Sequence, residues 1–123
     1  MKQAVLDTNF ILTCVKQKID FFHDLALEGI QILIPKQVIK EIKNIASSKK
    51  KLHFREDAKL ALKILDKKNF KQIDLKTEYV DKAIIQFAQE NKKIIVATLD
   101  KELKDKIKNP KLVIRRKKKL EII

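Results

Sequence analysis

Short runs of β-branched residues alternate with longer amphipathic stretches along this chain, and that alternation limits the fold more than any other feature. Apolar runs bounded by turn residues predict strands at residues 4–6, 31–34, 70–73, 94–97 and 112–114, with a last short strand or anchored tail at 120–123. Apolar residues at helical spacing predict helices near 19–27, 35–46, 58–65 and 78–89, and a charged helix between 100 and 109. This order forms right-handed βαβ units, so we predict a three-layer α/β/α fold around a central parallel, twisted, Rossmann-like sheet.

The length and composition suit one folded domain. A chain of 123 residues has room for one hydrophobic core but not two, and 45% of its residues are hydrophobic, which is too many for a disordered chain. No apolar stretch approaches the roughly 20 residues needed to cross a bilayer, and the N-terminal residues lack a small-residue cleavage site. We therefore expect residues 1–123 to form a single cytoplasmic domain without a membrane partner.

The chain is strongly basic. It carries 29 Lys and Arg against 16 Asp and Glu, a net charge of +13, and the resulting field attracts polyanions, nucleic acid above all. Aromatic side chains are limited to six Phe and Tyr79, mostly at core-like positions. We therefore expect nucleic acid to be held by its phosphates, with little readout of unstacked bases.

Two aspartates follow the two clearest strands. Asp7 comes directly after residues 4–6, and Asp100 comes shortly after residues 94–97. In a parallel sheet the carboxyl ends of the strands share one edge, where sites form, so both carboxylates are expected there. For either one alone, the simpler interpretation is the N-cap of the next helix.

Two further acids lie on the borders of apolar helical stripes. Glu41 comes three residues after Val38, and Asp81 comes three residues before Ile84. A salt bridge to a nearby Lys would explain either acid alone, because a half-buried carboxylate needs compensation. Four such acids reaching one sheet edge in a basic chain are explained more economically by a bound cation.

The composition of such a site bounds its metal and its chemistry. All the ligands would be oxygens, which favours Mg²⁺ or Mn²⁺ over zinc, with one or two ions. Such an ion activates water and stabilises charge during an in-line displacement on phosphate. His23 and His53 are interpreted as structural or surface residues, and Cys14 as a buried apolar residue.

Four segments resemble, in order, the four acidic motifs of PIN-domain nucleases. They are VLDTNF at 5–10, PKQVIKEI at 35–42, VDKAI at 80–84 and VATLDKEL at 96–103. The resemblance covers essentially the whole chain and implies one PIN domain over residues 1–123, with a basic C-terminal segment at 115–119. Its nearest branch groups single-domain archaeal proteins with VapC-type toxins and relatives of the eukaryotic pre-ribosomal RNA endonuclease.

The resemblance also implies roles for individual residues. Asp7 and Asp100 would contact the metal, with Glu41 and Asp81 completing the site directly or through water. Thr98 and Asn9 would support these ligands by hydrogen bonds, although a simple turn or N-cap explains Thr8 and Asn9 as well. Many toxins carry another acid where this chain has Leu103, which favours the ribosomal-type or archaeal branch over typical toxins.

Basic side chains around the acids are the candidates for drawing in the RNA backbone, although solvated surface charge or an acidic-partner site would explain them too. These RNA-binding candidates are Lys49, Lys50, Lys51, Arg55, Arg115, Arg116, Lys117, Lys118 and Lys119.

The favoured function is a metal-dependent endoribonuclease acting in ribosomal or other RNA processing, or as a VapC-like toxin. The candidate partners besides RNA are an antitoxin, a ribosomal precursor particle and a second copy of the chain. The alternative is a non-catalytic RNA-binding or ribosome-assembly protein that retains the PIN fold.

Overall fold

The computed structural model describes residues 1–123, apart from the side chain of Lys117. Its backbone forms a six-stranded sheet in the order β3-β2-β1-β4-β5-β6. The strands are β1 (Lys2–Leu6), β2 (Ile30–Pro35), β3 (Lys71–Ile73), β4 (Ile95–Ala97), β5 (Lys111–Arg115) and β6 (Lys119–Ile122). The pairs from β3 through β5 are parallel, which confirms the predicted α/β sheet.

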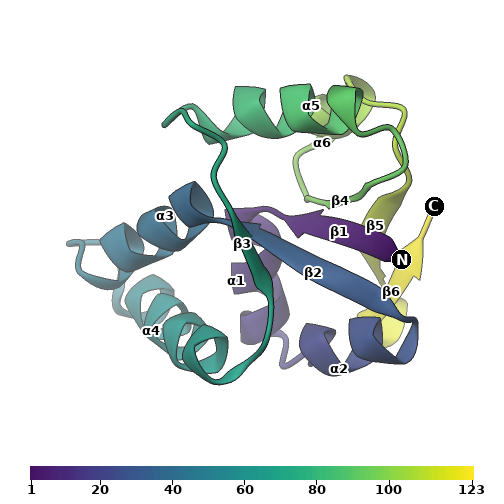
Figure 1. The fold of residues 1–123 in the computed structure, drawn as a ribbon. Helices are drawn as coiled ribbons and strands as arrows, with labels where there is room; N and C mark the ends of the chain where they lie inside the picture. The colour runs from purple at the N-terminus through teal and green to yellow at the C-terminus, as the bar shows by residue number, and fades with distance from the viewer.

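Helices cover both faces of the sheet. They are α1 (Thr8–Lys16), α2 (Phe21–Leu27), α3 (Lys36–Ala46), α4 (Leu52–Lys67), α5 (Val80–Glu90) and α6 (Lys101–Asp105). Figure 1 shows α5 and α6 above the sheet and α1, α2 and α4 below it. The chain adds strands in one direction from β1 to β3 and in the other from β4 to β5. The order therefore reverses between β1 and β4, which is where sites form in such sheets.

The central strands are buried on both faces because helices cover them above and below. Val5, Leu6, Val96 and Ala97 are all 0% exposed, which matches their continuous apolar runs. Edge strand β3 is half-buried at best. Burial therefore fixes β1 and β4 most firmly, and these two strands carry the candidate site at their carboxyl ends. Among the described residues, no helix combines the length and apolarity needed to span a membrane.

Two elements differ from the sequence predictions. Helix α1 was not predicted, although Phe10, Ile11, Cys14 and Val15 form a buried helical stripe in it. Strand β6 pairs antiparallel with β5, because the short helical turn η1 (Arg116–Lys118) that joins them is too short for a parallel crossover.

Candidate functional site

The first two acids are joined through Thr98 at the ends of β1 and β4. Leu6 lies opposite Ala97 in the sheet, so Asp7 and Thr98 are the next residues on paired strands. The Thr98 hydroxyl donates to Asp7 Oδ2 at 3.0 Å and accepts the Asp100 N–H at 3.1 Å. Thr98 is 0% exposed and Asp7 6% exposed. One buried hydroxyl therefore links both aspartates.

Both aspartates are also helix caps, as the simpler interpretation of each one predicted. Asp7 precedes α1 and its Oδ1 accepts the Thr8 N–H at 2.7 Å. Asp100 precedes α6 and its Oδ1 accepts the N–H groups of Glu102 at 2.9 Å and Leu103 at 3.3 Å. These cap hydrogen bonds fix the two carboxylates relative to the sheet edge. The cap hydrogen bonds to Asp100 are accepted by Oδ1 alone and do not involve Oδ2.

Glu41 reaches the same region from α3. It is half-buried, as the helical spacing predicted. Burial raises the pKa of Glu41, and the charges of Asp7 and Asp81 raise it further. Thr8 Oγ1 lies close enough to lower that pKa, yet it is buried without a hydrogen-bond partner of good geometry among the described residues. This is an unsatisfied polar atom beside a carboxylate.

Asp81 lies in the first turn of α5 and is exposed, more so than its helical position predicted. Its charge nevertheless acts on both Asp7 and Glu41. Burial is the largest cause that raises the pKa of Asp7; the hydrogen bonds from Thr8 and Thr98 oppose it, and the charges of Asp81 and Asp100 add to it. Four segments of the chain thus bring their acids close enough for their negative charges to affect one another. We call Asp7, Glu41, Asp81 and Asp100 the acid cluster.

The donor atoms of the acid cluster are those that a hard divalent cation prefers, but the four acids are too widely spaced to hold one ion. Its donors are all oxygens, and the ion pairs described elsewhere in the chain leave these four acids out. The salt-bridge interpretation of Glu41 and Asp81 is therefore not supported among the described residues. In the described arrangement, however, no three His, Cys, Asp or Glu side chains lie close enough to hold one ion. Holding an ion would require the acids to draw together, against the repulsion that raises the pKa values of Asp7 and Glu41.

Asn9 and the two histidines lie apart from these contacts. Asn9 is exposed, and the hydrogen bonds described for the chain include none from its side chain to the acid cluster. His23 and His53 are both exposed, and the His53 ring lies 4.1 Å from that of Phe54. Cys14 is buried, which raises the pKa of its thiol to about 12. The structure therefore supports the interpretation of His23 and His53 as structural or surface residues and of Cys14 as a buried apolar residue.

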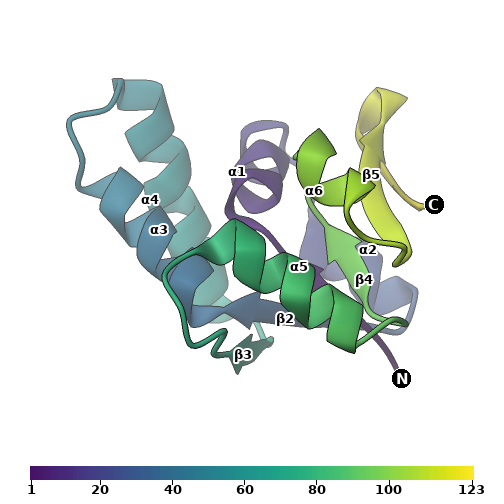
Figure 2. The ribbon, with the colours of Figure 1, turned by 90° about the horizontal axis from the view of Figure 1, so that it is seen from above.

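The basic candidates fall on two separate surfaces. Figure 2 shows the α3–α4 connection and the β5–β6 turn on opposite sides of α1. Exposed side chains at the first surface are Lys49, Lys50 and Lys51, beside the half-buried Arg55; those at the second are Arg115, Arg116, Lys118 and Lys119. The side chain of Lys117 lies outside the described residues. Arg115 Nε already donates to Glu121 at 2.7 Å, so its charge is partly compensated.

Comparison with known proteins gives the family. The family model described as a PIN like domain matches residues 4–118. The chain belongs to the PIN-like domain family. It is 37% identical to ribonuclease VapC4 of Methanocaldococcus jannaschii, over 99% of this chain and 97% of that protein.

Two further relatives of this PIN-like domain agree with that result. The chain is 34% identical to the rRNA-processing protein fcf1 of Schizosaccharomyces pombe; the match covers 85% of this chain and only 53%, about half, of that protein. The solved structure of the PIN domain endonuclease Utp24 is similar with a TM-score of 0.73 and 26% identity, over 98% of this chain and 95% of that one. The predicted PIN fold is confirmed.

Tyr79 and Lys82 lie beside the acid cluster of this PIN-like domain and were not among the site residues predicted from the sequence. A depression of about 290 Å³ is lined by Glu41, Tyr79, Val80, Asp81 and Lys82. The aromatic residues were expected mostly at core-like positions, but Tyr79 is 75% exposed. The predicted helix began at residue 78, whereas α5 begins at Val80, so Tyr79 is the N-cap residue and lies outside the buried stripe of the helix. The signal in the sequence that could have identified Tyr79 is its position two residues before Asp81.

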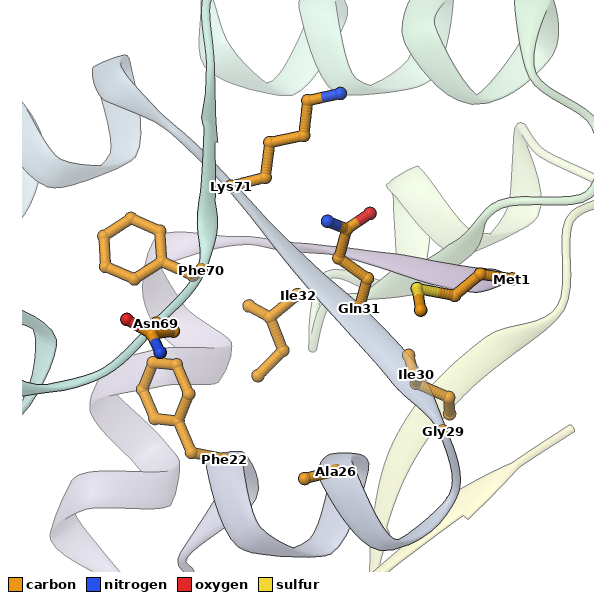
Figure 3. A pocket seen from close by; sticks show the side chains of 10 residues that line it. All are labelled: Met1, Phe22, Ala26, Gly29, Ile30, Gln31, Ile32, Asn69, Phe70 and Lys71. Atoms are coloured by element: carbon orange, nitrogen blue, oxygen red, sulfur yellow. The ribbon is translucent and has the colours of Figure 1, made fainter.

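A larger depression lies away from the acids of this PIN-like domain. Its volume is about 650 Å³, and it lies between α2, β2 and the start of β3 (Figure 3). Its lining residues are Met1, Phe22, Ala26, Gly29, Ile30, Gln31, Ile32, Asn69, Phe70 and Lys71. Met1, Gly29 and Phe70 each precede a strand. This depression is therefore at the amino ends of the strands, on the edge opposite the acid cluster.

Proposed function

We propose that this PIN-like domain is a metal-dependent endoribonuclease that hydrolyses RNA phosphodiester bonds at the acid cluster. Asp7, Glu41, Asp81 and Asp100 would hold Mg²⁺ or Mn²⁺ as one or two ions. The observation that carries the proposal is the buried Thr98 hydroxyl, which ties the Asp7 carboxylate to the backbone of Asp100 within range of the other two acids. A ribonuclease relative that covers nearly all of the chain supports the same reaction class.

The residues of the chain have distinct tasks in this proposal. A bound divalent ion supplies an activated water and neutralises charge on the phosphate. Thr98 and the Thr8 N–H hold the Asp7 carboxylate in one orientation, and the α6 amides hold Asp100. Hydrolysis joins the water oxygen to phosphorus and breaks one bridging P–O bond. The basic surfaces around Lys50 and Arg116 attract the backbone that the acids repel.

The biological setting follows the relatives. Similarity to an rRNA-processing protein supports action on a ribosomal precursor, and similarity to VapC4 supports a toxin role with an antitoxin partner. We propose that residues 1–123 act as one domain in the cytoplasm, alone or as a homodimer.

The test is RNA cleavage in Mg²⁺ or Mn²⁺ by wild type, Asp7→Asn and Asp100→Asn. We expect each variant to lose roughly 100-fold or more in kcat, because a metal ligand is removed while Asn still caps the helix. Asp20→Asn is a matched control, since Asp20 caps α2 by accepting the His23 N–H but lies outside the acid cluster. Cleavage by both cluster variants at the wild-type rate would assign the activity to another site.

A non-catalytic RNA-binding protein is the second candidate, and the spacing of the acids is the observation that favours it. Calorimetric titration separates the two candidates. Mn²⁺ binding at millimolar concentration that is lost in Asp7→Asn supports the enzyme. No Mn²⁺ binding in a protein that still binds RNA supports the alternative.

A further inference from the structure

We propose that Tyr79 is a base-binding residue of this site: its ring stacks on an unpaired base of the RNA beside the acid cluster, with Lys82 over the other face of the ring. This inference rests on the proposed function and names a residue that would bind the substrate at the same site. It differs from our expectation from the sequence, which was that the protein would make few contacts with unstacked bases.

The position of Tyr79 is the first argument. Its side chain is 75% exposed, and it shares the depression of about 290 Å³ with Glu41 and Asp81. That volume is at the lower end of the range for small-ligand clefts, roughly 300–1,000 Å³. An aromatic ring that stays in water costs hydrophobic stabilisation. A base beside the two carboxylates would cover it.

The backbone at Tyr79 is held from both sides. Its N–H donates to Thr77 Oγ1 at 3.2 Å, and its carbonyl accepts the Ala83 N–H at 3.0 Å. The preceding residue, Glu78, accepts a hydrogen bond from Lys40 Nζ of α3 at 3.1 Å. The ring therefore projects from a fixed point, which lowers the entropy lost when a ligand covers it.

Lys82 gives the ring a charged neighbour. Its ammonium lies over one face of the Tyr79 ring, 5.9 Å from the ring centroid, and Lys82 lines the same depression. A cation at this place attracts the phosphate of a nucleotide whose base lies on the ring. In this proposal Tyr79 contacts the base of a nucleotide and Lys82 contacts its phosphate.

The charge of the acid cluster explains why a base contact is useful here. Asp7 is buried and Glu41 is half-buried, burial raises the pKa of both, and their carboxylates repel phosphate near the bond to be cut. An aromatic face binds a base without adding to that repulsion. In a duplex both faces of each base are already stacked, so only an unpaired base can use the ring.

Other exposed aromatic groups are less suited to this task. Phe54 is 47% exposed, but its ring lies against His53, with centroids 4.1 Å apart. That pair lies at the start of α4 and does not line the depression with Glu41 and Asp81.

Tyr79 can be observed directly because the chain has one Tyr and no Trp. Tyrosine emission is followed by stopped flow as wild type is mixed with unpaired RNA in Mg²⁺, so that binding is seen before cutting. Free N-acetyltyrosinamide at the same concentration corrects for light absorbed by the RNA. We expect emission to fall with unpaired RNA and to change little with a duplex or with an oligomer that has abasic positions.

Kinetics give the second readout. Tyr79→Ala should raise KM for unpaired RNA about tenfold and leave kcat within about threefold, because stacking contributes to binding. Tyr79→Phe should stay close to wild type, since the ring stacks without its hydroxyl. Leu27→Ala removes a side chain that is 74% exposed on α2 and should change neither constant.

The outcomes separate this inference from the proposed function. Unchanged KM in Tyr79→Ala, a defect as large in Tyr79→Phe, or equal quenching by duplex RNA would overturn base stacking while the nuclease proposal stands. Quenching by unpaired RNA alone, in a protein that cuts nothing, would support the base site and refute the nuclease.

Discussion

Two depressions on this molecule differ in size and in chemistry, and the smaller one is lined by two acids of the candidate site. The depression at the amino ends of the strands has about 650 Å³, but its lining lacks any carboxyl group. Gln31, one of its few polar residues, already accepts a hydrogen bond from Gln3 at 2.7 Å. The depression beside α5 has about 290 Å³ and is lined by Glu41 and Asp81. The larger volume therefore does not mark the candidate site.

The two edges of the sheet explain the difference. At the carboxyl ends, strands β1 to β4 each lead toward the start of an α-helix, and Asp7, Asp81 and Asp100 all lie at or beside helix N-termini. The partial positive charge there stabilises carboxylates that would otherwise repel each other. The amino ends of the strands have no equivalent, because the preceding helices end there.

The largest expected effect tests that contrast directly. Glu41→Gln and Asp81→Asn in the smaller depression should each lower kcat for RNA cleavage by roughly 100-fold, because a charged ligand is lost. Asn69→Ala and Lys71→Ala, two exposed residues of the larger depression, should leave kcat within about twofold. Equal losses in both sets would mean that the larger depression takes part in catalysis.

The hydroxyl of Thr98 is the next contact to test. Thr98→Val removes the donor to Asp7 and the acceptor for the Asp100 N–H. We expect activity or metal affinity to fall about 10-fold to 100-fold, the size typical of residues that orient metal ligands. Thr98→Ser keeps the hydroxyl and should recover most of the loss. Activity that Thr98→Val keeps and Thr98→Ser loses would show that the methyl packing of Thr98 matters and its hydrogen bonds do not.

A smaller effect is expected from the basic residues that flank the acid edge. The Lys50→Ala, Lys51→Ala double variant should bind RNA more weakly, and the slope of log K against log salt should fall by about 1.4, or 0.7 for each lost phosphate contact. Lys92 and Lys93 are equally exposed but precede β4, at the amino ends of the strands. Their double Ala variant should leave the slope unchanged, and an equal fall would show that the whole surface binds RNA without preference.

The smallest effect concerns stability and its dependence on pH. Burial raises the pKa of Asp7 above its usual value of 3.8, so the folded protein binds a proton more tightly than the unfolded chain does. The free energy of unfolding contributed by Asp7 therefore falls as pH rises above about 4 and stays lower beyond the folded pKa. Asp7→Asn should be more stable than wild type at pH 7, by on the order of 1 kcal/mol.

Urea unfolding at several pH values, without divalent ions, measures this difference. The advantage of Asp7→Asn should shrink as pH falls toward 4. Millimolar Mg²⁺ should then stabilise wild type more than the variant, because an ion that binds only the folded state shifts the equilibrium toward it. An advantage that is constant with pH would show that the Asp7 charge is not the cause.

The α/β class and the candidate acids were predicted from local sequence patterns. The apolar runs at β1 and β4 and the helical stripes of α3 and α5 gave the α/β class, and the acids next to them gave the candidate site. Patterns of this kind need only a few neighbouring residues. Helix α1 carried the same signal in Phe10, Ile11, Cys14 and Val15, and was still missed.

Contacts between distant segments were decided only by the tertiary structure. The Thr98 bond to Asp7 spans 91 positions and depends on the register of β1 against β4. The antiparallel pairing of β6, the pairing of Arg115 with Glu121, and the exposure of Tyr79 likewise depend on where elements begin and what packs beside them. The sequence alone thus identified the candidate residues of the site. Their distances, burial and charges were set by strand pairing and packing, because those interactions join residues that no local pattern relates.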